Sequence, residues 1–383
     1  MLPNHVDVAI VGGGPVGTYL AHALARQGKS VAVLEKELTP RVDDPRMLAI
    51  STGGQQLLSR QSCWSDQLAD APIAHVSVTQ RGFLGHTHLH ASEIGEDVLG
   101  YVVPYSKLHP LLVERLPASC AYAQGVEVTQ IQFTSAYALI SYQHENTSAS
   151  MTARLVVMAD GGQLATRVAG IEYREQDYHQ SALIALIEAT HKPEQTALER
   201  FLPDGAIALL PRPEGYALIW TAPSAETTQR MALSDEDLLD ALQVQVGSKA
   251  GLFMSVGQRH QIPLRLRYAK TLVAPRCVVI GNAAQYLHPI AGQGLNLGLR
   301  DATDLAKILQ SFNDPGAPEC LARYPKHRRL DKLNGVGFTD SLIKLFGIPG
   351  MGHVRSAGLM ALESSPIMKK RLLRHLAYGI RSI

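Results

Sequence analysis

A glycine-rich turn between two apolar segments near the N-terminus limits the fold of this chain more than any other feature. Val6–Val11 is a short apolar strand, Gly12–Gly17 reads G-G-G-P-V-G, and a helix is expected to run to about Gln27. Ser30–Leu34 is a second apolar strand, and an acidic residue, Glu35, follows it. This order of strand, G-x-G-x-x-G, helix, strand and acidic residue predicts a βαβ unit that binds a dinucleotide.

The glycines of this turn have distinct expected roles. Gly12 permits the tight turn, Gly14 lets the backbone approach a pyrophosphate, and Gly17 allows the helix to pack closely on the strand. Glu35 can accept hydrogen bonds from both hydroxyls of an adenosine ribose. The motif alone suits FAD and a nicotinamide nucleotide equally well.

A second glycine-rich segment, Val278–Ala306, has the pattern of a buried strand, a loop and a helix that starts at about Leu295. Gly292 and Gly294 stand just before that helix. Glycine lets the backbone come close to a ligand, and a helix N-terminus favours negative charge. We therefore expect this segment to hold a planar or anionic ligand.

The composition is that of a globular protein of 383 residues, with 46% apolar and 18% charged residues. No window approaches about 20 uninterrupted apolar residues, so we expect no transmembrane helix. The first strand begins almost at the N-terminus, so we expect no signal peptide. The four cysteines are widely scattered, which suits reduced thiols in a cytoplasm. We also expect no nucleic-acid partner.

Other catalytic patterns find little support. His86, His88 and His90 alternate as on one face of a strand, but no carboxylate or cysteine pattern accompanies them. A polar strand face or cavity wall is therefore favoured, and no metal is expected. No G-x-S-x-G motif is present, so hydrolysis is unsupported.

Three fingerprints in this chain together resemble those of the single-component FAD aromatic hydroxylases. The first is the N-terminal G-x-G-x-x-G, which is followed by Arg46 in D-x-R-x-x-A. The second consists of Asp160, Gly161 and Arg167 after an apolar strand. The third is G-N-A-A-Q…L-H-P-I-A-G-Q-G-x-N-L-G-L-R-D. Within the family, Asn282 in place of aspartate and Gln285 in place of a common histidine resemble the polyprenyl-methoxyphenol hydroxylases of ubiquinone synthesis.

The resemblance implies an α/β fold with interleaved domains. A Rossmann-like FAD-binding domain of the glutathione-reductase type is expected at residues 1–72, 100–175 and 263–330. A sheet-based substrate domain is expected at 73–99 and 176–262, and a helical basic tail at 331–383.

The resemblance also implies which residues contact the cofactor. The expected FAD-binding residues are Gly12, Gly14, Pro15, Gly17, Glu35, Lys36, Arg46, Val128, Asp160, Gly161, Asn282, Gln285, Pro289, Gly292, Gly294, Leu295 and Asn296. No catalytic base is identified. His288 and Pro289 are the candidates near the flavin, and a structural role for His288 is favoured over proton transfer.

The implied reaction is hydroxylation of a hydrophobic phenol. FAD is reduced by NADPH or NADH and reacts with dioxygen to a flavin C(4a)-hydroperoxide, whose distal oxygen passes to the ring. A related hydroxylase or epoxidase with another aromatic or isoprenoid substrate, and a flavoprotein scaffold without turnover, are the alternatives. In the substrate module, Phe201, Leu209 and Trp220 either line an apolar pocket or belong to the core.

The C-terminal segment carries most of the charge asymmetry. Residues 321–383 hold 12 Lys and Arg against 3 Asp and Glu, whereas the whole chain holds 36 against 34. Met368, Leu372, Leu376 and Ile380 form a stripe at helical spacing beside basic residues. This helix either lies on anionic lipid or packs on the body or on a partner of a ubiquinone-synthesis complex. The expected location is cytoplasmic, with the inner face of the cytoplasmic membrane as the place of any peripheral contact.

Overall fold

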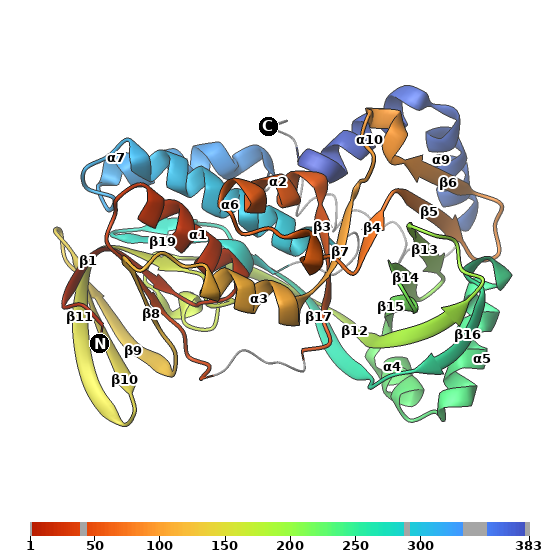
Figure 1. Cartoon of the computed structure of the whole chain (residues 1–383), viewed down its shortest axis with the longest axis horizontal. Helices are drawn as coiled ribbons and strands as arrows, with labels where there is room; N and C mark the ends of the chain where they lie inside the picture. Colours follow the sequence, from red (N-terminus) through yellow and green to blue (C-terminus); the bar gives the residue numbers. More distant parts are fainter. Residues whose placement is uncertain (1, 39–43, 287–291, 332–350, 380–383) are drawn as a thin grey trace.

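The computed structural model describes residues 2–38, 44–286, 292–331 and 351–379. Two large sheets and a small one, with helices packed against them, form the molecule (Figure 1). The helices are α1 (Pro15–Arg26), α2 (Thr52–Arg60), α3 (Tyr105–Glu114), α4 (Ser224–Met231), α5 (Asp235–Val246), α6 (Gln293–Gln310), α7 (Pro318–Leu321), α9 (Gly352–Ser364) and α10 (Pro366–Tyr378).

The first sheet is parallel through most of its width. Its order is β18 (Val273–Ala274), β19 (Cys277–Val279), β11 (Thr147–Met158), β1 (His5–Val11), β2 (Val31–Leu34) and β8 (Cys120–Ala123), with β10 (Ala138–His144) joining β11 to β9 (Val126–Phe133). β1 pairs in parallel with β2 and β11, and β11 pairs in parallel with β19. The sheet is thus parallel from β19 to β8, and its antiparallel strands are β18 at one edge and β9 and β10 beside β11. The central strands are buried on both faces, which explains their almost continuous apolar sequences.

The second sheet is mostly antiparallel and lies beside the first along the long axis of the molecule (Figure 1). Its order is β20 (Gln285–Tyr286), β17 (His260–Ala269), β12 (Tyr173–Thr190), β15 (Gly215–Pro223), β14 (Gly205–Arg212), β13 (Thr196–Leu202), β5 (His75–Gln80) and β6 (His86–His90), with β16 (Leu252–Val256) on β12. The third sheet contains β3 (Met47–Ser51), β7 (Gly100–Pro104) and β4 (Ala71–Ile73).

Helices α1 and α6 lie side by side over the first sheet (Figure 1). Their contact is close because Gly298 of α6 has no side chain, and a Cβ there would lie 2.6 Å from Cγ2 of Val16. α1 follows β1 and α6 follows β19, and both strands run parallel to β11. The two helix N-termini therefore meet at the carboxyl edge of the sheet, where ligands bind in open α/β folds.

Two features of the second sheet follow from local sequence. The β14–β15 hairpin turns at Pro213-Glu214. Ser234 caps α5, since its hydroxyl accepts a hydrogen bond from the N–H of Asp237 at 3.1 Å. α5 then covers one face of this sheet with Leu238 and Leu242, both fully buried.

Candidate functional site

The N-terminal turn has the geometry that its sequence predicts. Gly12 has φ +106°, and a Cβ on it would lie 2.5 Å from the carbonyl oxygen of Ala159. A Cβ on Gly17 would lie 2.1 Å from the carbonyl oxygen of Gly12, so α1 packs closely on β1. Gly14 differs, because a Cβ there would meet no protein atom within 4 Å. The space over Gly14 is thus open to a ligand.

Glu35 lies at the end of β2 and is held in place by backbone amides. Its Oε2 accepts a hydrogen bond from the N–H of Gly13 at 2.6 Å, and its Oε1 accepts one from the N–H of Glu37 at 2.9 Å. Each carboxylate oxygen keeps a second lone pair for a ribose hydroxyl. The neighbouring Lys36 lies at the exposed rim and pairs with Glu127 at 2.8 Å.

The N-terminus of α6 forms the opposite wall. Gly292 is its N-cap in the left-handed region, at φ +57°, and no side chain caps this end. A Cβ on Gly294 would meet no protein atom within 4 Å. Two helix N-termini without a side-chain cap, those of α1 and α6, therefore border one space.

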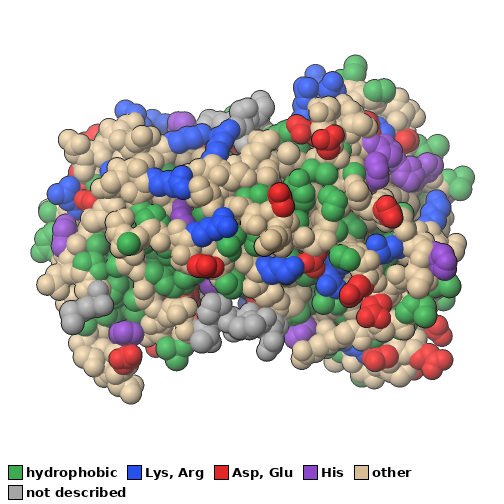
Figure 2. Space-filling model, in the orientation of Figure 1, with side chains coloured by type: hydrophobic (Ala, Val, Ile, Leu, Met, Phe, Trp, Pro, Cys, Tyr) green, Lys and Arg blue, Asp and Glu red, His purple; other side chains and the backbone are tan. Residues whose placement is uncertain are grey.

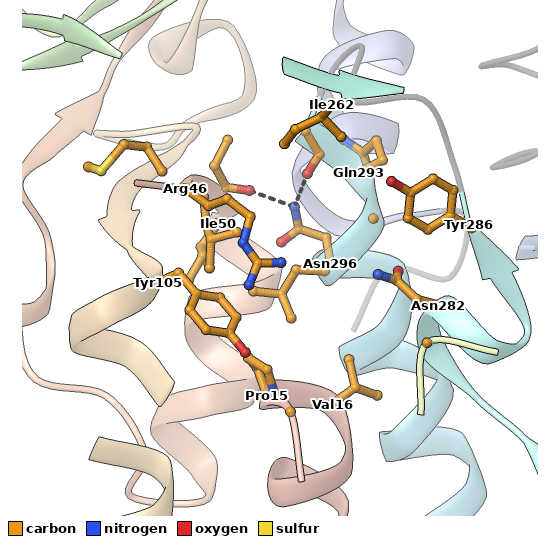
Figure 3. A pocket seen from close by; sticks show the side chains of 18 of the residues that line it. Pro15, Val16, Arg46, Ile50, Tyr105, Ile262, Asn282, Tyr286, Gln293 and Asn296 are labelled. Atoms are coloured by element: carbon orange, nitrogen blue, oxygen red, sulfur yellow. Dashed lines mark hydrogen bonds between the residues drawn. The ribbon is translucent and has the colours of Figure 1, made fainter. Parts of the chain in front are cut away.

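Asn296 fastens this helix end to β3. Its amide nitrogen donates to the carbonyl oxygens of Ala49, at 2.9 Å, and Gly292, at 3.1 Å (Figure 3). Its oxygen accepts a hydrogen bond from the N–H of Ser51 at 2.9 Å. Asn296 lines the site, but both amide hydrogens are engaged with backbone. It thus holds the wall in position.

Arg46, Tyr105 and Asn282 line the space between the two helix ends (Figure 3). Nε of Arg46 donates to both carboxylate oxygens of Asp44, at 2.8 and 3.0 Å, and its guanidinium carbon lies 4.1 Å from the ring centroid of Tyr105. Ion pair and ring together orient the guanidinium toward the turn of α1. Asn282 is exposed to the cavity beside Tyr286.

Asp160 shapes the loop after β11. Its carboxylate accepts hydrogen bonds from the N–H groups of Gly162 at 2.9 Å and Leu164 at 2.5 Å. The carbonyl oxygen of Gly161 accepts a hydrogen bond from Arg267. The acidic side chain therefore fixes the backbone of this fingerprint, which borders the cavity.

One cavity of about 760 Å³ joins these elements. It is lined by fourteen of the residues expected to bind the cofactor: Gly12, Gly14, Pro15, Glu35, Lys36, Arg46, Val128, Asp160, Gly161, Asn282, Gly292, Gly294, Leu295 and Asn296. Its volume lies in the ordinary range for ligand sites. His288 and Pro289 lie outside the described residues.

Two of the expected residues do not line this cavity. Gly17 acts in helix packing, as described above. Gln285, expected to contact the cofactor, is buried on β20, and its amide donates to Oδ2 of Asp301 at 2.5 Å. Asp301 also accepts a hydrogen bond from the N–H of Gly281 at 3.0 Å. Gln285 thus supports the loop of Asn282 from beneath, because its side chain points into the core.

The far end of the cavity is apolar and belongs to the second sheet. Its wall includes Val76, Ala182, Ile184, Ala197, Ala208, Leu210, Ala217, Ile219 and Ile262. Phe201, Leu209 and Trp220 are buried but do not line it, so the core interpretation is the correct one for all three. Leu209 and Trp220 belong to the core beneath α5.

Helix α10 closes this apolar end. Leu373, Leu376 and Ala377 line the cavity, and Lys369 pairs with Glu93 at 3.2 Å. The stripe expected on this helix is divided between two surroundings, since Leu376 lines the cavity whereas Met368 is 56% exposed. Ile380 lies outside the described residues.

Among the described residues, no three His, Cys, Asp or Glu side chains are grouped closely enough to hold a metal ion. Within the same residues, no helix has the length and apolar character needed to span a bilayer.

Comparison with known proteins identifies the family. A model described as FAD binding domain matches residues 5–332. The chain is 35% identical over 387 residues to ubiquinone hydroxylase UbiL of Rhodospirillum rubrum, with 96% of this chain and 89% of that protein covered. It is 29% identical to 3-demethoxyubiquinol 3-hydroxylase of Escherichia coli, with 98% and 99% covered.

A solved structure shares the fold. p-Nitrophenol 4-monooxygenase PnpA from Pseudomonas putida superposes with a TM-score of 0.78 at 17% identity, with 99% of this chain and 100% of that chain covered. The α/β architecture expected from the sequence is thereby confirmed.

Proposed function

The chain belongs to the FAD binding domain family, and from this premise we propose that it is a flavin monooxygenase acting on a polyprenylated phenol of ubiquinone biosynthesis. The reaction adds one hydroxyl group to the aromatic ring and consumes dioxygen and NADPH or NADH. The observation that carries this proposal is a continuous cavity that runs from the dinucleotide turn to the apolar face of the second sheet.

The residues at the polar end of the cavity suit FAD. The open spaces over Gly14 and Gly294 admit a ligand that a side chain would exclude. Glu35 offers carboxylate oxygens to a ribose, and the N-termini of α1 and α6 favour phosphate and other negative charge. When bound, FAD supplies electron transfer from the nicotinamide and the activation of dioxygen.

The protein's own part is to position the substrate and to exclude water. The small and branched side chains of the second sheet, Ala182, Ala208 and Ile219 among them, offer a smooth apolar wall to an isoprenoid chain. Leu373 and Leu376 of α10 cover the same space. Such burial keeps water from the reacting groups, which limits loss of reduced oxygen as hydrogen peroxide.

We further propose that α10 rests on the membrane from which the substrate comes. Its inner face lines the cavity, while Ile367 and Met368 are exposed next to the basic side chains of Lys370, Arg371 and Arg374. Figure 2 shows Lys and Arg side chains gathered at the upper edge of the molecule, where Figure 1 places α10. Apolar and basic groups together suit an anionic lipid surface.

The decisive experiment is turnover by the isolated protein. We expect purified protein to carry FAD and to hydroxylate a prenylphenol only when NADPH or NADH and dioxygen are both present. A strain that lacks the protein should accumulate one prenylphenol, which identifies the ring position. Protein that takes up no FAD contradicts the proposal, and FAD-loaded protein without turnover of any prenylphenol indicates the scaffold or another substrate.

A further inference from the structure

One carboxyl group stands in the apolar wall of the cavity. Glu199 lies on β13, where it pairs with Ala208 of β14 and with Val78 of β5. Ala208 pairs in turn with Ile219 of β15, so these side chains share one face of the sheet. Glu199, Ala208 and Ile219 all line the cavity. The carboxyl group is therefore placed among aliphatic side chains and points toward the substrate space.

No group of the described part of the chain neutralises this carboxylate. Neither an ion pair nor a hydrogen bond engages it there, and the cavity face of the adjoining strands carries Val76, Val78, Ala208 and Leu210. Arg200 points to the other face, where its Nη1 lies 3.4 Å from Oγ1 of Thr79.

The remaining titratable groups on the cavity wall belong to other elements. They are Glu35, Lys36, Glu37, Arg46, Tyr105, Glu127, Asp160, Arg167 and Tyr286, all from the first sheet, its loops, α3 or β20. On α10, Lys369 is paired with Glu93 and Glu363. Burial alone raises the pKa of Glu199 to about 7.

Glu199 lies on the part of the cavity wall that adjoins the flavin end. Ala197, two positions earlier on the same face, packs in a cluster with Met47 and Ala49. Ala49 is the residue whose carbonyl oxygen accepts the hydrogen bond from Asn296 at the start of α6. Two residues of a strand span only about 7 Å. A substituent of an aromatic ring that is held near α6 can therefore reach Glu199.

An isolated carboxyl group in an apolar wall costs stability unless a ligand pairs with it. We propose that Glu199 accepts the hydrogen bond of the substrate's phenol hydroxyl and takes its proton during hydroxylation. The phenolic O–H bond breaks, the proton moves to the Glu199 carboxylate, and the electron pair stays on the phenol oxygen. The ring becomes more electron-rich, and the proton returns to that oxygen as the product forms. This inference rests on the proposed phenol hydroxylation.

Equilibrium binding to the FAD-loaded protein without nicotinamide tests this role. The probes are 2-geranyl-6-methoxyphenol and the same compound with its phenol oxygen methylated, each titrated while the flavin absorbance is followed at pH 6 to 9. We expect the wild type to bind the phenol at least tenfold more tightly than the ether, with a preference that grows as pH rises through about 7. Glu199→Ala should reduce the preference to less than twofold. Glu199→Gln should keep part of it and lose its dependence on pH.

Leu210→Ala is the matched control, since it enlarges the cavity at the same wall and leaves the carboxyl group of Glu199 in place. It should weaken the binding of both probes alike. If Glu199→Ala keeps the wild-type preference for the phenol over the ether, the inference is overturned. Turnover of the phenol by the wild type would then still support the proposed function. A wild type that converts no phenol overturns both. Flavin content and circular dichroism equal to those of the wild type establish that the variants are folded.

Discussion

The guanidinium of Arg328 lies 2.7 Å from the carboxylate of Asp301, and both side chains are almost wholly buried. Asp301 also accepts the N–H of Gly281, so the ion pair is connected to the loop that presents Asn282 to the cavity. Arg328 comes from a segment beyond the glycine-rich fingerprint. The ion pair thus connects the segment that contains Arg328 to the loop beneath the flavin end of the cavity.

Replacing Arg328 by Met is expected to cost about 3 to 5 kcal/mol, because it leaves buried carboxylates without their counter-ion. Arg328 pairs with three of them, Asp301, Asp304 at 2.8 Å and Asp331 at 2.6 Å, and Asp331 has a further ion pair with Arg300 at 3.4 Å. Urea unfolding followed by circular dichroism measures the loss. The neighbouring Arg329 is exposed, so Arg329→Met is the control and should change stability by about 0.5 kcal/mol or less. Equal stability of the two variants would show that the buried network contributes little.

The dinucleotide turn could be predicted from local sequence, because the role of each glycine depends only on residues close to it in the chain. A tight turn needs Gly12, and a close strand–helix contact needs Gly17, so both roles follow from the motif. The helix cap at Ser234 is also a local feature, because its hydroxyl accepts a hydrogen bond from the N–H of Asp237, three residues later. The FAD-binding fold followed from the order of three such fingerprints.

Features set by packing between distant segments could not be predicted this way. Alternation on a strand says that Leu209 and Leu210 face opposite sides, but only the position of α5 decides that Leu209 is core and Leu210 lines the cavity. Likewise the motif predicts a ligand contact for Gln285, but the hydrogen bond to Asp301 on α6 turns its side chain into the core. Tyr105 and Ile262 carry no motif, and only the fold brings them to the site.

Gly14→Ala and Gly294→Ala are expected to weaken FAD binding at least tenfold without loss of stability. In both cases the new Cβ meets no protein atom within 4 Å, and neither glycine has a positive φ. The methyl group instead occupies space in the cavity that the ligand needs. FAD fluorescence titration of the apoprotein measures the affinity, and thermal unfolding of the apoprotein measures stability. Gly358→Ala, equally unobstructed on α9, is the control. Unchanged FAD affinity in both cavity variants would contradict this placement of the cofactor.

The triple change Lys370→Glu, Arg371→Glu and Arg374→Glu is expected to abolish binding to anionic vesicles. All three side chains are exposed on α10, and each basic residue near such a surface contributes about 1 kcal/mol. Co-sedimentation with phosphatidylglycerol vesicles at low and high salt measures the effect, with phosphatidylcholine vesicles as the lipid control.

A matched charge reversal separates the surface of α10 from net charge. Arg60, Arg323 and Arg329 are exposed on other parts of the molecule, and changing them to Glu alters the net charge by the same amount. That variant should still sediment with anionic vesicles. If it is lost from the vesicles to the same degree, the attraction is a property of overall charge and α10 has no special part.

Glu199 should make the stability of the protein depend on pH in a particular window. Its ordinary pKa is 4.5, and burial raises it to about 7 in the folded state. Between these values the unfolded chain releases its proton while the folded protein keeps it, so stability falls as pH rises, and the loss is complete above about 7. The shift corresponds to at most about 3 kcal/mol.

Glu199→Gln removes this ionisation, so its stability relative to the wild type should rise by up to about 3 kcal/mol between pH 4.5 and pH 8. Urea unfolding at several pH values in that range measures the difference. Glu188→Gln, which removes an exposed carboxyl group from β12 of the same sheet, should show no such trend. A constant difference between Glu199→Gln and the wild type across the range would mean that the carboxyl group ionises as freely in the folded protein as in the unfolded chain. Its isolation in the apolar wall would then be refuted.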